Sequence, residues 1–73
     1  MKEGTIVEFK DKTSGKYSHD GLYYFAQECR IKLASGEWID GVVYADFNVF
    51  NRKFYVREKA DFYDKFKEYE GKL

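Results

Sequence analysis

The chain has 73 residues, of which 21% are aromatic and 36% are charged, with 13 acidic and 13 basic side chains, no proline and one cysteine. This length predicts one domain with a narrow margin of stability, because a chain of this size buries only about 60% of its unfolded surface. The balanced charge provides no long-range field that attracts a polyanion. The single cysteine excludes an intramolecular disulfide and an all-cysteine zinc site.

The amino-terminal residues lack the apolar run of a secretory signal, and no stretch approaches the roughly 18 apolar residues of a membrane span. No internal repeat or low-complexity tract divides the chain. We therefore expect a cytoplasmic protein without a membrane partner, with residues 1–73 forming a single domain.

The first half of the chain has the period-two pattern of strands. Residues 5–10 alternate as a half-buried strand does, and residues 22–33 alternate again over a length that is long for one strand. We expect the second strand to bend or bulge midway while one face carries its inward side chains. These are Tyr23, Phe25, Cys29, Ile31 and Leu33.

The sequence next predicts a hairpin. Ser35 and Gly36 are typical of a tight turn into a strand over residues 37–44. Gly41, inside that strand, indicates a bulge or a close backbone approach. Residues 46–52 then hold two rings, Phe47 and Phe50, in a predicted loop that leaves both partly exposed.

The last third combines a strand and a helix. Residues 53–58 alternate, and after Ala60 the pattern changes to Phe62, Phe66 and Tyr69 on one helical stripe. Asp61 is expected as the N-cap, with a pair to Lys65 one turn later, and Gly71 follows the expected end of the helix. We expect this helix to plug an open end of the sheet.

These elements predict a mainly β (α+β) fold. The first choice is a small SH3-like barrel or a strongly bent antiparallel sheet of four to five strands with one C-terminal helix. The alternative is an α+β roll in which the helix lies across one sheet face.

A resemblance covers residues 41–66. The strand Gly41-Val42-Val43-Tyr44, the strand Phe54-Tyr55-Val56-Arg57-Glu58, and Asp61-Phe62 with Phe66 resemble the carboxyl-terminal half of a small bacterial domain family of unknown function. That family has a V-V-Y strand, a W-V-R strand and an aromatic-led terminal segment; this chain lacks the proline that follows its W-V-R. The resemblance implies a compact β-rich domain of bacterial or phage type and assigns no site residues.

Catalytic and metal-binding groups are sparse. His19 with Cys29 and Asp20 would make a nucleophilic site, but sequence neighbours cannot hold an imidazole as a triad requires. His19 with Asp11, Asp20 or Asp46 has no metal-ligand spacing. We expect an exposed turn histidine, a buried thiol, no enzymatic activity, no cofactor and no metal.

The strand around Asp40 is the predicted binding surface. Asp40 lies in phase with Trp38 and Tyr44, so either it is solvent-exposed or it is a carboxylate turned toward the core that needs a partner. We expect it to be solvent-exposed, with the buried side of the strand formed by Ile39, Val43 and Ala45. Trp38 and Tyr44 would then flank Asp40 on an open face that suits a binding partner.

The segment 52–59 carries four basic side chains and one acidic one. It fits either a charged edge strand protected from aggregation or a strand that binds phosphates and stacks a base on Tyr55. Glu37, Asp40 and Asp46 are expected to neutralise it, which favours the first interpretation.

Together these patterns predict a non-enzymatic protein-binding module, an accessory protein of a bacterium or its phage, whose partner is a second copy or another protein. The predicted binding residues are Trp38, Asp40, Tyr44, Phe47, Phe50 and Tyr55. The alternative is a β-barrel module that binds single-stranded nucleic acid through Arg52, Lys53, Tyr55, Arg57 and Lys59.

Overall fold

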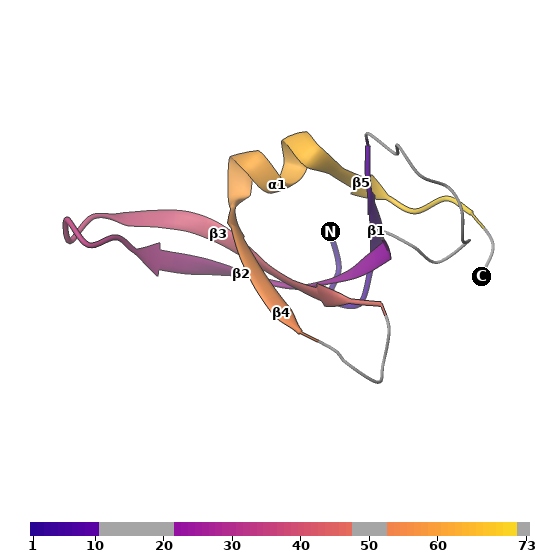
Figure 1. The fold of residues 1–73 in the computed structure, drawn as a ribbon, viewed down its shortest axis with the longest axis horizontal. Coiled ribbons are helices and arrows are strands. Elements are labelled where there is room, and N and C mark those ends of the chain that lie inside the picture. Colours follow the sequence, from indigo (N-terminus) through magenta and orange to yellow (C-terminus); the bar gives the residue numbers. More distant parts are fainter. Residues whose placement is uncertain (11–21, 48–52, 72–73) are drawn as a thin grey trace.

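The computed structural model describes residues 1–10, 22–47 and 53–71. Its elements are β1 (Ile6–Phe9), β2 (Leu22–Lys32), β3 (Trp38–Asp46), β4 (Phe54–Glu58), α1 (Lys59–Lys65) and β5 (Phe66–Glu68). The strands form one sheet in the order β4-β3-β2-β1-β5, and each adjacent pair is antiparallel (Figure 1). The mainly β fold with one short helix near the C-terminus is confirmed.

The sheet is strongly bent but does not close into a barrel. Strands β2 and β3 separate β4 from β1, so in a flat sheet β4 and β1 would lie about 14 Å apart. The guanidinium of Arg57 on β4 nevertheless lies 5.6 Å from the ring centroid of Phe9 on β1. The two ends of the sheet therefore curl toward each other over one face, which we call the inner face. Of the two predicted forms, the strongly bent antiparallel sheet is observed and the closed barrel is not.

Helix α1 lies over the inner face and closes an aromatic core (Figure 1). The ring of Phe62, which is 0% exposed, stacks on Phe66 with centroids 4.7 Å apart and lies 5.4 Å from the ring of Tyr44. Val7 of β1 and Val42 of β3 are fully buried in the same cluster. Large rings thus let a very short chain enclose a core.

The helix differs from its prediction at both ends. Glu58 is its N-cap and makes no side-chain cap, while Asp61 lies in the first turn, so the N-cap prediction is wrong. The helix ends before Phe66, which has an extended backbone and pairs with Phe9 of β1. Strand pairing at this point overrides the helical period, and the predicted stripe through Tyr69 to Gly71 is wrong. The predicted pair of Asp61 with Lys65 is confirmed at 3.2 Å.

A β-bulge at Ala26 decides which side chains of β2 face inward. The register to β3 runs Phe25↔Tyr44 before the bulge and Glu28↔Val42 after it, so one extra residue on β2 changes the alternation. The predicted bulge is confirmed, but the predicted single face through it is wrong. Beyond the bulge the outer face carries Cys29, Ile31 and Leu33, and the inner face carries Glu28, Arg30 and Lys32.

The outer parts of β2 and β3 form a hairpin that projects from the body of the molecule (Figure 1). The predicted turn is confirmed: the Leu33 amide donates to the Glu37 carbonyl at 2.7 Å, and Gly36 has a φ of 93°. At Gly41 a Cβ would lie 2.5 Å from Cδ1 of Ile31, so this glycine makes room for a side chain, and the registers to β2 and β4 contain no bulge there. Within the described residues, no helix has the length and apolar character needed to cross a membrane.

Candidate functional site

A cleft of about 600 Å³ lies where the projecting hairpin meets the start of α1. The hairpin contributes side chains from both of its strands, and the helix contributes its first turns together with the last residue of β4. The lining residues are Arg30, Trp38, Ile39, Asp40, Glu58, Lys59, Ala60 and Tyr63.

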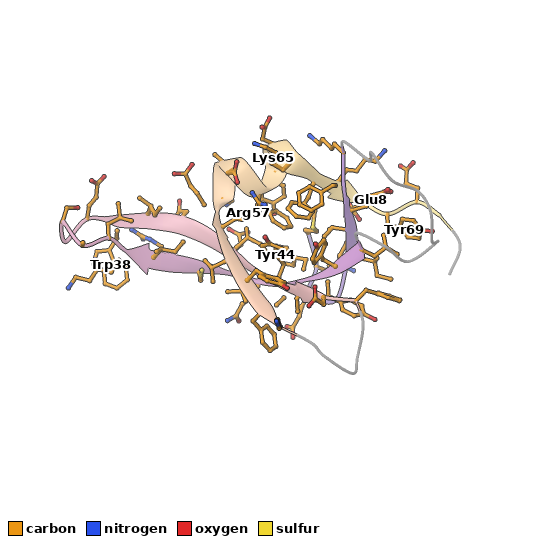
Figure 2. All side chains as sticks on the ribbon, viewed as in Figure 1. Glu8, Trp38, Tyr44, Arg57, Lys65 and Tyr69 are labelled. Atoms are coloured by element: carbon orange, nitrogen blue, oxygen red, sulfur yellow. The ribbon has the colours of Figure 1, made fainter. Side chains whose placement is uncertain are left out.

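The cleft exists because helix α1 covers only part of the inner face of β3. Trp38, Asp40, Val42 and Tyr44 alternate along the inner face of β3. Helix α1 covers Val42 and Tyr44, and Tyr44 is only 6% exposed. The same face continues past the helix, where Asp40 is exposed and Trp38 is 52% exposed. Figure 2 shows Trp38 on the far part of the hairpin and Tyr44 within the body.

Three charged residues of the cleft, Arg30, Asp40 and Lys59, are held in ion pairs. Arg30 Nε lies 3.3 Å from Asp40 Oδ1 across the two strands, and Lys59 Nζ lies 2.7 Å from Glu28 Oε1. The hydrogen bond between the last two groups lowers the pKa of Glu28 and raises the pKa of Lys59. Exposed pairs of this kind contribute little to stability because water screens them, so a bound partner can replace them.

Lys32 adds a contact to the indole itself. Its ammonium lies 5.8 Å from the ring centroid of Trp38, directly across the hairpin. This is the geometry of a cation–π contact at an exposed site, which is worth about 0.5–1 kcal/mol. The contact orients the indole without covering it.

Arg57 lies outside the cleft, and its side-chain contacts stabilise the fold. Its Nε–H donates to the Tyr44 hydroxyl at 2.8 Å, and its Nη1 donates to Asp61 Oδ2 at 2.7 Å. The bond to Asp61 is the main cause that raises the pKa of Arg57, and the same bond lowers the pKa of Asp61. The guanidinium also lies over the rings of Phe9 and Phe66.

The structure brings together two residues of the predicted protein-binding surface. Trp38 and Asp40 line the same cleft, and Asp40 is exposed as expected. The predicted exposure of Tyr44 is wrong, because α1 covers the face that carries Tyr44 and Val42. On the face expected to be buried, Ala45 is buried as predicted, whereas Ile39 is half-buried. Val43, expected on the buried side, is only half-buried.

The other predicted rings lie away from the cleft. Tyr55 is half-buried on the inner face, and its hydroxyl donates to Asp46 Oδ2 at 3.1 Å. Burial is the main cause that raises the pKa of Tyr55, and the Asp46 carboxylate adds to it. Phe47 stacks on Tyr24 with centroids 5.1 Å apart. Phe50 lies outside the described residues.

The predicted nucleic-acid surface is not a row of free cations. Arg57 is paired with Asp61, and Lys59 is paired with Glu28. These two direct partners are not among the expected Glu37, Asp40 and Asp46, but, beside Glu28, the charge of Asp40 also contributes to the raised pKa of Lys59. Lys53 is exposed, and Arg52 lies outside the described residues.

Sequence reasoning missed Arg30 and Tyr63 in the cleft. Only the exact place of the bulge puts Arg30 beside Asp40, so the alternation of the sequence alone does not bring it to the cleft. Tyr63 carries no distinct sequence signal, although its ring stands edge-on to Phe62 at 5.4 Å and lines the cleft. The exposed Phe54 and Val56 on the outer face were also missed.

No group of three or more His, Cys, Asp and Glu side chains that could hold a metal ion occurs in residues 1–10, 22–47 and 53–71. Cys29 is half-buried on the outer face beside Gly41, not in the core as expected. His19, Asp11 and Asp20 lie outside the described residues. The absence of enzymatic activity stays a prediction.

No protein-family model matches the chain, and neither a curated protein nor a solved structure matches it. The resemblance of residues 41–66 to a bacterial domain family therefore stays a prediction.

Proposed function

We propose that the protein is a non-enzymatic protein-binding module that holds its partner in the cleft beside Trp38. One observation carries the proposal: Trp38, the only tryptophan of the chain, is half-exposed on a strand face whose next aromatic ring, Tyr44, is buried. Trp38 exposes a large apolar area to water, and this cost is recovered when a partner covers the ring.

The composition of the cleft supports a protein partner. Tryptophan, tyrosine and arginine are the residues that most often dominate binding energies at protein interfaces, and Trp38, Tyr63 and Arg30 lie within one cleft. The pair of Arg30 with Asp40 and the pair of Lys59 with Glu28 give the surroundings no excess of either charge. The partner we infer presents an apolar side chain to the indole, with polar groups of both signs around it.

Binding of single-stranded nucleic acid, the alternative, has weaker support because Arg57 and Lys59 are already paired with carboxylates. Titration of labelled single-stranded DNA and RNA at low salt tests it. A nucleic-acid site would show micromolar affinity and lose it with a log–log salt slope of about −0.7 per neutralised phosphate. We expect no such binding.

The function is tested with two matched variants of the hairpin. Binding segments are selected from a displayed peptide library on the wild-type protein, and their affinities are then measured for Trp38→Ala and Leu33→Ala. The two side chains belong to one hairpin but lie on opposite faces. We expect Trp38→Ala to weaken binding about 30-fold, equal to about 2 kcal/mol, and Leu33→Ala to leave it unchanged. Equal effects of both variants would contradict the proposal.

We also propose that the bent sheet is an open relative of an SH3-like barrel. The support is the pairing of β1 with both β2 and β5, which places the first and last strands side by side, together with the helix that joins the two edge strands. An experimental structure with a closed β-barrel or an unrelated strand order would contradict this assignment.

A further inference from the structure

Strand β4 is an edge of the sheet and has hydrogen-bonding groups that point away from it. The Asp46 amide donates to the Lys53 carbonyl at 3.2 Å, which makes 46 and 53 a hydrogen-bonded pair of the β3–β4 ladder. Because such pairs alternate in antiparallel strands, Tyr55 and Arg57 also bond toward β3. The backbone groups of Phe54 and Val56 and the Glu58 amide therefore point outward, whereas the Glu58 carbonyl, at the N-cap, belongs to the first turn of α1.

Arg57 and Glu58 give this edge charge, but it lacks two other features that keep sheet edges apart. The chain has no proline, and the register of β4 with β3 contains no bulge. Phe54 and Val56, both on the outer face, are 67% and 53% exposed. The opposite edge, β5, is only three residues long. Strand β4 is thus the better template for a further strand.

We propose that two copies of the chain pair antiparallel through β4, with Val56 opposite Val56 of the second copy, so that the two sheets join into one. A two-fold axis through this pair places Val56 in a mutual hydrogen-bonded pair and sets Phe54 opposite Glu58 of the other copy. Tyr55 then lies opposite Arg57 on the inner face. The arrangement matches every residue of β4 with a residue of the other β4.

The charges of β4 select this register. A two-fold axis at Glu58 would place two carboxylates opposite each other, which is destabilising, and would need residues that belong to α1. An axis at Phe54 would leave residues 55–58 beyond the β4 of the second copy. Only the axis at Val56 pairs the whole strand without opposing like charges. This self-complementarity favours a second copy over an unrelated strand.

Two further observations support a second copy. Val43 of β3 lies beside Val56 on the outer face, and Ala45 lies beside Phe54, so pairing at β4 extends an apolar row that already crosses the sheet. The chain has a formal net charge of zero, so two copies approach without long-range repulsion.

Cysteine cross-linking tests the register. The variants Val56→Cys and Phe54→Cys are made in a Cys29→Ser background, so each chain carries one exposed thiol on the same edge. Opposed residues of a hydrogen-bonded pair have Cα atoms about 5.5 Å apart, which a disulfide can span, whereas the two Phe54 positions would lie about 14 Å apart. We expect oxidation to give a covalent dimer from Val56→Cys and little from Phe54→Cys. Equal yields, or none from either variant, would overturn the proposal.

Sedimentation of the unmodified chain supplies an independent test. We expect a concentration-dependent dimer whose dissociation constant rises about 10-fold or more in Val56→Lys, because two ammonium groups then face each other. Leu33→Lys, an equal change on the hairpin away from the edge, should leave the dimer intact. A wild-type chain that stays monomeric at millimolar concentration would contradict the proposal, even if β4 then captures a strand of another protein.

Discussion

The guanidinium of Arg57 lies 5.4 Å from the ring centroid of Phe66, although the two residues belong to β4 and β5, the opposite edges of the sheet. Asp61, between them on α1, accepts a hydrogen bond from the same guanidinium at 2.7 Å. One side chain thus joins the two ends of the bent sheet to the helix that crosses it (Figure 2). Helix α1 and Arg57 cover the inner face at this point, whereas the inner face beside Trp38 is exposed to solvent.

The ion pair of Arg57 with Asp61 predicts a specific loss of stability in acid. The pKa of Asp61 is lowered in the folded chain, so its stabilising contribution is fully present above the unfolded pKa of about 3.9 and is lost as the pH falls through the lower folded value. Urea unfolding from pH 7 down to pH 2 measures it. We expect Asp61→Asn to be less stable than wild type at pH 7 and to lose less stability on acidification.

A matched control for the acid experiment is Asp64→Asn, which removes a more exposed carboxylate from the same helix. This change leaves the bond of Arg57 with Asp61 in place, so the loss of stability that this bond causes on acidification should remain. Parallel pH curves for wild type and Asp61→Asn would mean that Asp61 makes no net contribution in this pH range.

The stacked rings of Phe62 and Phe66 predict that the helix is essential to the fold. Phe62 is fully buried, and its replacement by alanine should cost about 3–5 kcal/mol. That cost approaches the whole stability of a small domain, about 5–15 kcal/mol. Thermal melting by circular dichroism should therefore show Phe62→Ala largely unfolded, and Phe54→Ala, which removes an exposed ring, close to wild type. A cooperative Phe62→Ala melt at the wild-type temperature would contradict this role.

The close contact at Gly41 predicts that the cost in stability of replacing this glycine depends on Ile31, its neighbour across the hairpin. A Cβ at this position would lie 2.5 Å from Cδ1 and 2.8 Å from Cγ1 of Ile31. Gly41→Ala should cost about 1–3 kcal/mol, the usual range for inserted atoms that force side chains to move. The cost should shrink in an Ile31→Ala background, because the colliding atoms are then gone. Equal costs in both backgrounds, measured by urea unfolding, would show that Ile31 is not the cause.

Several elements were predictable from the sequence because local patterns determine them. The turn at Gly36, the long strand with its bulge and the aromatic helix all follow from residue type and period. The faces beyond the bulge were not predictable, because a shift of one residue at Ala26 exchanges the inner and outer sets of β2.

The cleft was only partly predictable for a related reason. Trp38 and Tyr44 share a strand face, and no local pattern indicates that α1 covers one and leaves the other open. The end of α1 depends on the pairing of Phe66 with Phe9, a contact between the two ends of the chain. Such long-range contacts decide burial here, and they bring Arg30 and Tyr63 to a site that the sequence indicated only through Trp38 and Asp40.

The fluorescence of Trp38 tests the proposed function most directly, because the chain has no other tryptophan. The selected binding segment, free of tryptophan, is titrated into the wild-type protein while calorimetry follows complex formation independently. If the segment covers the cleft, the emission should shift to shorter wavelength and acrylamide should quench it less as the complex forms. Saturated binding with unchanged emission and unchanged quenching would contradict a partner site at Trp38.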